Sequence, residues 1–295
     1  MRLVLAVIAA ALLAGPTNSR QPRTASPTLA QACEGRSGWN DPAPPAHAFG
    51  NVYYVGTCGI TSLLVTSAQG HVLLDGAAGK AGPLIARNIE ALGFKLRDVK
   101  YILNSHEHGD HAGGIAHLQR VTGASMLARE PAIATLERGH GDRGDPQFLQ
   151  LPDFPPVAHV RAIADGETVK LGTLALTAHA TPGHAPGGTS WTWRSCEGTH
   201  CLGFAYADSV SAISDKQYRY ADHSGYVAAF RNSLEAIAAL PCDVLLTPHP
   251  NGSSLFERIA GRAPLVDADA CSRYAQTGRD GLEARLQSER ETAAP

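Results

Sequence analysis

Four side chains that commonly bind metal ions lie close together in the stretch NSHEHGDHAGG, residues 104–114: His106, His108, Asp110 and His111. Imidazole and carboxylate groups together suit Zn²⁺, although nickel, manganese and iron accept the same donors. The helical motif of zinc proteases also begins with a His-Glu pair. It requires a second histidine four residues after the first, where this chain has Asp110. The stretch therefore predicts a zinc site of another kind.

Glu107 stands between two of these histidines. Side chains alternate along an extended segment, so the carboxylate of Glu107 is expected to point away from its neighbours. We interpret it as a solvated glutamate or as a residue that supports the ligands from behind. It is not assigned as a ligand.

Two further histidines occupy settings of the same kind, each after a strand-like run and within a Pro/Gly turn. They are His184 in TPGHAPGG and His249 in LLTPHPNG. Six donors exceed the needs of one tetrahedral zinc, so the count predicts two metal ions, each with an open position for water. The other histidines are expected at the surface or in packing: His47, His71, His117, His140, His159, His179, His200 and His223.

The elements that must position these donors can be located from the hydrophobic pattern. Residues 51–75 are β-branched and aromatic runs broken by glycine, which predicts consecutive antiparallel strands. A helix is expected from Pro83 to Gly93, followed by the strand VKYILNS. A similar order of strands, helix and strand occurs later in the chain, with a helix expected over residues 223–240 and a buried strand in CDVLLTPHP. This pattern favours two packed sheets with helices outside, in one domain.

The segment from Arg138 to Pro156 is rich in Pro and Gly. It predicts a long surface loop, and a loop of this length is more often functional than idle.

The composition excludes some partners. The chain has 295 residues, 44% of them hydrophobic, and a formal net charge of -2. Because no basic stripe is present, nucleic acid is not expected as a partner.

The N-terminus has the layout of a secretory signal: Arg2 precedes an apolar run that ends at Gly15 and Pro16. Residues 1–20 are expected to be the signal, with the cleavage point left open. The run is too short to span a bilayer comfortably, so no stable membrane anchor is expected. The alternative is a buried helix, but the polar segment that follows offers it no packing partner.

An exported chain with six cysteines is expected to form disulfides, and the even number leaves none over. Six cysteines allow fifteen connectivities. The turn in CEGTHC favours Cys196 with Cys201, and the simplest completion joins Cys33 to Cys58 and Cys242 to Cys271. A cysteine zinc site is the alternative, but the chain contains no C-x-x-C pair.

The ordered set of His106-x-His108-x-Asp110-His111, His184 in TPGH and His249 in TPHP resembles the metallo-β-lactamase superfamily. The stretches GWNDP, YVGTCGI, TSWTWRSCEG and YADSVSAISD are similar to those of the secreted subclass B3 metallo-β-lactamases. The resemblance runs from about Gly38 to the C-terminal helix.

This resemblance implies an α/β fold, a four-layer αββα sandwich, over a single domain at residues 33–295. It implies His106, His108 and His184 as ligands of one zinc, with Asp110, His111 and His249 as ligands of a second. In other subclasses a cysteine near the ADS position binds the second metal. This chain has Ser209 there.

The resemblance also implies a mechanism. A hydroxide shared by the two zinc ions and oriented by Asp110 attacks the β-lactam carbonyl of penicillins, cephalosporins or carbapenems. Ser209 and Ser211 resemble serines that bind the substrate carboxylate, with turn residues as the alternative. Asp75 resembles a buried aspartate that supports a metal ligand, with a simple turn aspartate as the alternative. A periplasmic monomer that acts on small-molecule antibiotics is expected.

Two other functions remain open. A thioester or lactone hydrolase of the same superfamily often uses an aspartate near the ADS position as a bridging ligand, and Asp208 stands there. A periplasmic protein that stores zinc without catalysis is the second alternative.

Overall fold

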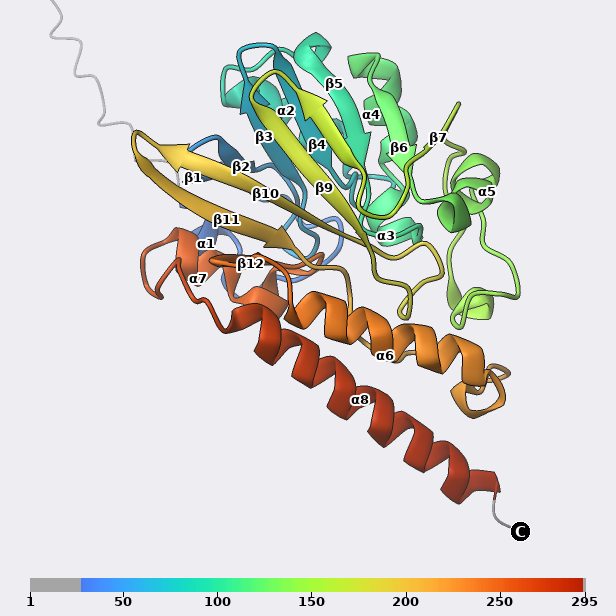
Figure 1. Ribbon diagram of the computed structural model, residues 1–295. Helices are drawn as coiled ribbons and strands as arrows, with labels where there is room; N and C mark the ends of the chain where they lie inside the picture. The colour runs from blue at the N-terminus through green and yellow to red at the C-terminus, as the bar shows by residue number, and fades with distance from the viewer. Residues whose placement is uncertain (1–27, 294–295) are drawn as a thin grey trace, which may run out of the picture.

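The computed structural model describes residues 28–293, so the expected export signal over residues 1–20 lies outside the described residues. Two β-sheets pack face to face, and helices cover the outer surface of each sheet (Figure 1). The expected four-layer αββα sandwich is confirmed.

The first sheet has seven strands in sequential order. Neighbours from β1 to β4 are antiparallel, and neighbours from β4 to β7 are parallel. The strands are β1 (Ala46–Phe49), β2 (Val52–Tyr54), β3 (Leu63–Ser67), β4 (Gly70–Leu74), β5 (Val99–Leu103), β6 (Ser125–Ala128) and β7 (Arg161–Ala162). The antiparallel run from β2 to β4 confirms the strands expected over residues 51–75.

The second sheet has five strands in the order β12-β11-β10-β9-β8. Only β11 and β12 are parallel neighbours; the other pairs are antiparallel. The strands are β8 (Thr168–Leu171), β9 (Leu174–Ala180), β10 (Thr189–Glu197), β11 (His200–Tyr206) and β12 (Val244–Leu246).

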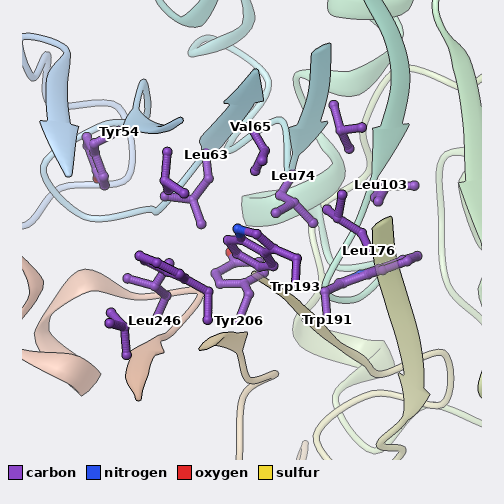
Figure 2. Packing of buried hydrophobic residues seen from close by; sticks show 14 of the residues in the cluster. Tyr54, Leu63, Val65, Leu74, Leu103, Leu176, Trp191, Trp193, Tyr206 and Leu246 are labelled. Carbon is purple, nitrogen blue, oxygen red and sulfur yellow. The ribbon is translucent and has the colours of Figure 1, made fainter. Parts of the chain in front are cut away.

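The alternation of side chains in the strands builds separate hydrophobic layers. In β4, Val72 and Leu74 pack between the sheets, whereas Leu73 packs beneath the outer helices. In the second sheet, Leu246 faces the space between the sheets and Leu245 faces the opposite helices. Figure 2 shows the layer between the sheets, with Trp191 and other aromatic rings opposite aliphatic side chains of the first sheet. Both faces of these strands are therefore buried, which explains their nearly continuous apolar sequence.

The helices divide between the two outer surfaces. Buried residues of α2 (Gly82–Ala91), α4 (Ile115–Thr122) and α5 (Glu130–Arg138) pack on the first sheet. Buried residues of α6 (Ser224–Ala238) and α8 (Ala270–Ala293) pack on the second. The expected helices lie at α2 and α6. The short elements are α1 (Leu29–Ala32), α3 (Gly109–Ala112), α7 (Leu255–Ile259), η1 (Leu96–Asp98), η2 (Phe148–Gln150), η3 (Tyr220–Asp222) and η4 (Pro250–Ser253).

The far end of α8 fastens the segment that leads from β11 to α6. Glu289 is buried in α8, and its carboxylate accepts hydrogen bonds from the backbone N–H groups of Tyr220 and Ala221 at 3.1 and 2.8 Å. Arg285, one turn earlier in α8, donates to the hydroxyl of Ser214. The segment over residues 214–221 is thus held by side chains of the long helix. Figure 1 shows α8 running alongside α6.

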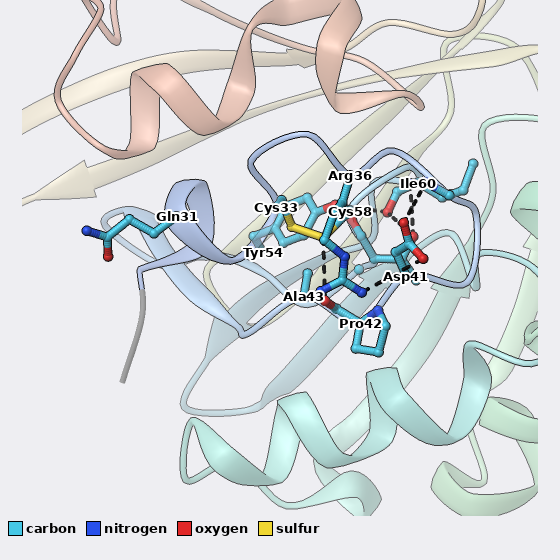
Figure 3. Close-up of a disulfide and its surroundings, with 12 residues drawn as sticks. Gln31, Cys33, Arg36, Asp41, Pro42, Ala43, Tyr54, Cys58 and Ile60 are labelled. Atoms are coloured by element: carbon cyan, nitrogen blue, oxygen red, sulfur yellow. Dashed lines mark hydrogen bonds and ion pairs between the residues drawn. A yellow bond between two sulfur atoms is a disulfide. The ribbon is translucent and has the colours of Figure 1, made fainter. Parts of the chain in front are cut away.

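Three disulfides join the pairs favoured by the sequence. Cys196–Cys201 closes the turn between β10 and β11, and Cys242–Cys271 joins the start of β12 to α8. Cys33–Cys58 ties the segment after α1 to the turn after β2, beside Asp41 (Figure 3).

No helix within residues 28–293 is both long enough and apolar enough to cross a membrane.

Candidate metal centre

The candidate ligands come from loops at the carboxyl ends of strands in both sheets. Hydrogen bonds join the loop after β5 to strand β10 of the second sheet: the N–H of Thr189 donates to the carbonyl of Ser105 at 2.7 Å, and Trp191 Nε1 donates to the carbonyl of Asn104 at 2.9 Å. The strand that precedes each group is β4 for Asp75, β5 for residues 104–111, β9 for His184, β11 for Asp208 and β12 for His249. One edge of the sandwich therefore gathers side chains that are far apart in the sequence.

Two groups of donors are close enough to hold a metal ion. One group comprises His106, His108 and His184, and the other comprises His106, Asp110 and His111; within each group, the ligand atoms all lie within 4.8 Å of one another. His249 is in neither group. However, its Nε2 lies 3.5 Å from Oδ2 of Asp110, and its ring centroid lies 5.1 Å from that of His111. All six predicted donors thus adjoin one another.

Carboxylates hold one ring nitrogen of each of the first two histidines. His106 Nδ1 lies 2.8 Å from Oδ1 of Asp208, and His108 Nε2 lies 2.8 Å from Oδ2 of Asp145. The other nitrogen of His106, Nε2, is buried and has no hydrogen-bond partner. A carboxylate behind a histidine fixes the tautomer whose opposite nitrogen can bind a metal. The free nitrogens are therefore His106 Nε2 and His108 Nδ1.

Backbone carbonyls hold His184 and His249, and the carboxylate of Asp75 lies close to His111. His184 Nδ1 lies 3.0 Å from the carbonyl of Ser211, and His249 Nδ1 lies 3.1 Å from the carbonyl of Gly59. His111 Nδ1 lies 3.2 Å from Oδ2 of Asp75. The Nε2 atoms of His111 and His249 both face Oδ2 of Asp110, and Nε2 of His184 lies 3.4 Å from the side-chain amide nitrogen of Gln147. In each of these rings Nε2 is the atom directed toward the other candidate ligands or their neighbours. Gly59 must be glycine because a Cβ there would lie 2.2 Å from the carbonyl oxygen of Ser37.

The electrostatics suit cation binding. Burial lowers the pKa of His106 well below its usual range, and burial with the adjacent His108 lowers the pKa of His184 to about 3. Burial opposes ionisation of His111, but Asp110 outweighs it and raises the pKa of His111 to about 10. Burial likewise opposes ionisation of Asp110, yet His111 holds the pKa of that carboxyl well below its usual range. A metal ion at this pair would take the place of the His111 proton.

Asp75 is fully buried and supports two loops of the site. Its carboxylate accepts hydrogen bonds from the N–H and hydroxyl of Ser105, at 2.6 and 2.7 Å, and from the hydroxyl of Tyr206 at 2.6 Å. It also lies behind His111, as described above. Asp75 thus has the surroundings of a residue that orients a ligand rather than those of a simple turn aspartate.

Glu107 is buried, so the interpretation as a solvated glutamate is wrong. Its Oε1 accepts a hydrogen bond from the N–H of Gly187 at 2.9 Å, and burial raises its pKa to about 7. A Cβ at Gly187 would lie 2.5 Å from Oε2 of Glu107 and also 2.5 and 2.9 Å from Cβ and Cα of Ala132, which explains the glycine. Glu107 therefore joins the loop of His106 and His108 to the loop of His184. The period-two alternation placed its side chain away from the histidines but gave no sign of what covers it.

Ser209 and Ser211 follow β11 beside the cluster. The hydroxyl of Ser211 lies 2.9 Å from Nδ1 of His184, and Ser211 is exposed. Ser209 is largely buried. Both residues lie on the same segment as Asp208, at the side of the cluster that carries His106 and His184.

The donor set fits zinc: imidazole nitrogens and a carboxylate converge, and the opposite ring atoms of His106, His108, His184 and His249 lie at hydrogen-bond distance from protein oxygens. Sequence reasoning missed Asp145 and Gln147. The side-chain amide nitrogen of Gln147 lies 3.4 Å from the carbonyl of His184. The long loop predicted over residues 138–156 was the only sign of them.

Comparisons with known proteins agree with this arrangement. The family described as the metallo-beta-lactamase superfamily matches residues 55–201. The solved structure of the metallo-β-lactamase MIM-1 from Novosphingobium pentaromativorans is 51% identical, with a TM-score of 0.88, covering 90% of this chain and 99% of that one. MEM-A1, a subclass B3 metallo-β-lactamase from a soil metagenome library, is 46% identical, with a TM-score of 0.83, covering 86% of this chain and 100% of that one.

Similarity to curated proteins is more local. A hydroxyacylglutathione hydrolase from Anaeromyxobacter dehalogenans is 36% identical over 94 residues, which are 32% of this chain and 29% of that protein. The chain spans about half or less of the length of the curated relatives that it matches.

Proposed function

The chain belongs to subclass B3 of the metallo-β-lactamase superfamily, and we propose that it is a secreted dizinc β-lactamase that hydrolyses penicillins, cephalosporins and carbapenems. The similarity to MIM-1 and MEM-A1 over nearly their whole length supports β-lactam hydrolysis. The observation that carries the proposal is the convergence of imidazole nitrogens and one carboxylate at the candidate metal centre.

We assign ligands to each of the two zinc ions by the short distances between their donor atoms. His106, His108 and His184 would hold the first ion, since their donor atoms form one close group. Asp110, His111 and His249 would hold the second, since Oδ2 of Asp110 lies 3.3 Å from Nε2 of His111 and 3.5 Å from Nε2 of His249. Three protein ligands per ion leave a position for water or substrate, as catalytic zinc requires.

When bound, zinc would lower the pKa of water so that it can attack at neutral pH, and would polarise the lactam carbonyl. The protein supplies the orientation. Asp110 stays ionised, so its carboxylate can accept a hydrogen bond and aim the attacking water at the carbonyl carbon. The carboxylates of Asp208 and Asp145 keep His106 and His108 from rotating as charge develops on the substrate. No nucleophilic side chain is needed.

Ser209 and Ser211 would bind the carboxylate that β-lactam antibiotics carry beside the lactam ring. Hydroxyl groups donate strong hydrogen bonds to a carboxylate. A substrate held by them would lie next to His184, whose Nδ1 is 2.9 Å from the hydroxyl of Ser211. They would therefore fix the orientation of the ring rather than take part in bond cleavage.

We also propose export to the periplasm, on the basis of the first residues and the disulfides, with residues 33–295 acting as one monomeric domain. Structural disulfides form and persist in oxidising compartments. This matches an enzyme that meets antibiotics outside the cytoplasm.

Thioester hydrolysis is the main alternative, because several curated relatives are hydroxyacylglutathione hydrolases. That alternative would use Asp208 as a bridging ligand. Instead, Oδ1 of Asp208 is engaged by Nδ1 of His106, on the side of the ring opposite its free nitrogen. The position of Asp208 therefore favours the lactamase.

The test is a substrate panel with the purified, zinc-loaded protein. We expect turnover of a penicillin, a cephalosporin and a carbapenem, and little turnover of an acyl-glutathione or an acyl-homoserine lactone. A protein with both zinc ions bound that hydrolyses no β-lactam would overturn the proposal. Absence of any turnover would favour a zinc-storing protein.

A further inference from the structure

The loop after α5 contacts two of the candidate ligands from one side. Asp145 is buried, and while its Oδ2 binds Nε2 of His108, its Oδ1 accepts the N–H of Gln147 at 2.7 Å. Gln147 in turn lies beside the carbonyl of His184. The side-chain amide nitrogen of Gln147 also lies 3.4 Å from Nε2 of His184. Residues 145–147 therefore hold the ring of His108 and contact His184, although they follow no strand and belong to no long helix.

Asp215, which lies outside this loop, contacts the loop both before Asp145 and after Gln147. The N–H of Asp215 donates to the carbonyl of Pro146 at 2.8 Å. Its carboxylate accepts two hydrogen bonds from the guanidinium of Arg143, at 2.8 and 3.2 Å, and one from the N–H of Leu149 at 3.1 Å. Asp215 thus contacts three residues of the loop: Arg143 before Asp145, Pro146 between Asp145 and Gln147, and Leu149 after Gln147.

The carboxylate of Asp215 is also bound to its own segment. Oδ1 accepts the N–H groups of Gln217 and Tyr218 at 2.8 and 3.0 Å, and Asp215 itself is only 2% exposed. Desolvation works against ionisation here. The hydrogen bonds from Arg143 and from the backbone nevertheless lower the pKa of Asp215 to about 2, so it remains a charged acceptor.

We propose that Asp215 is a positioning residue of the metal centre, which clamps the loop over residues 143–149 so that Asp145 is held on Nε2 of His108. The proposal rests on the proposed function only in that His108 is a zinc ligand. Asp215 lies four residues after Ser211, so the same clamp joins the loop to the segment proposed to bind the substrate carboxylate.

The amide variants test this because an amide cannot replace either carboxylate fully. Both oxygens of Asp145 accept hydrogen bonds, so the NH₂ of Asp145→Asn must face either His108 or the N–H of Gln147. In Asp215→Asn the NH₂ must face either Leu149 or the N–H groups of Gln217 and Tyr218. Each substitution removes a negative charge and turns the new NH₂ donor toward another hydrogen-bond donor, so that at least one hydrogen bond is lost.

The experiment measures zinc affinity by competition with a chromophoric chelator, and the visible spectrum of the Co²⁺-substituted protein. Asp145→Asn should weaken zinc binding roughly 10- to 100-fold, and Asp215→Asn should weaken it roughly tenfold and shift the Co²⁺ bands. The double variant should be no weaker than Asp145→Asn alone, because both act through one contact. Asp153→Asn is the matched control: it removes the same charge from an exposed position of the same loop and should change neither readout.

The proposal is overturned if Asp215→Asn binds zinc as tightly as the wild type, or if the two effects add. Should Asp215→Asn fail to fold, Arg143→Gln removes two of the same hydrogen bonds from a half-exposed side chain and should weaken zinc binding severalfold. Unchanged zinc binding in Arg143→Gln would then overturn the clamp. These readouts need no substrate, so a wild type that binds zinc without hydrolysing β-lactams refutes the proposed function alone.

Discussion

Nδ1 of His106 lies 2.8 Å from Oδ1 of Asp208, and both side chains are completely buried. Burial raises the pKa of Asp208 well above its usual range, and its Oδ1 has this imidazole nitrogen as its hydrogen-bond partner. The second oxygen, Oδ2, has no hydrogen-bond partner. The pair fixes His106 with Nε2 directed away from Asp208, and it distinguishes a supporting aspartate from a bridging ligand.

The first prediction concerns this pair. Asp208→Ala should weaken zinc binding roughly 10- to 100-fold, because His106 loses the acceptor that orients it. Asp208→Asn should recover part of that loss, since the amide oxygen can still accept the Nδ1–H of His106. Zinc titrations of the two variants beside the wild type provide the measurement. Equal and complete loss of one zinc ion in both variants would instead identify Asp208 as a ligand.

The second prediction compares Asp110, which we propose to orient the attacking water, with Ser209, which we propose to bind the substrate carboxylate. Asp110→Ala should lower kcat/KM for a penicillin by more than about a hundredfold, because it removes both a ligand and the group that orients water. Ser209→Ala should raise KM roughly tenfold, which corresponds to the loss of one hydrogen bond to a carboxylate. Steady-state kinetics with each variant gives both values. The reverse order of the two losses would refute the assigned roles.

The third prediction concerns metal removal. A chelator should abolish β-lactam hydrolysis, added Zn²⁺ should restore it, and an inhibitor that acylates serine should have no effect. The melting temperature should fall on chelation, because a ligand present at about a thousandfold above its Kd stabilises the folded state by about 4 kcal/mol. Hydrolysis that survives chelation but stops after serine acylation would contradict the metal centre.

The fourth prediction concerns acid stability and Asp215. Its pKa is about 2 in the folded protein and near the usual 3.8 when unfolded. Its charge therefore stabilises the fold above about pH 4, and this contribution is lost as the pH falls toward 2, with a slope of at most about 1.4 kcal/mol per pH unit. Urea unfolding of zinc-free wild type and Asp215→Asn should show a difference in free energy of unfolding that shrinks across this window. A pH-independent difference would rule out the ionised carboxylate as its source.

Much of the fold was accessible from the sequence, because local patterns and burial agree in the strands and helices. Val72, Leu73 and Leu74 are all buried, on alternating sides of β4, so their run of apolar residues could be recognised as a strand between two layers. The ends of α2 followed from Pro83 and Gly93. The export signal and the number of zinc ions remain predictions.

The supporting residues could not be predicted, because their roles depend on contacts between distant segments. Asp145 and His108 are 37 positions apart, and nothing local to either residue relates them. Glu107 shows the same limitation: the alternation of side chains left open a solvated or a supporting position, and the contact with the loop of Gly187 that buries it could not be foreseen. Ligand spacing within one short stretch is visible in a sequence, but the shell that orients those ligands is not.

The contact between Glu289 and the N–H groups of Tyr220 and Ala221 has a consequence for the order of events during synthesis. Every candidate metal ligand leaves the ribosome before Glu289 does. The residues of both sheets and all six candidate ligands have therefore been synthesised while the segment over residues 214–221 still lacks its acceptor in α8. A premature stop codon after residue 284 would consequently spare the candidate ligands. It would remove Arg285 and Glu289, the side chains of α8 that hold the segment over residues 214–221, which carries Asp215.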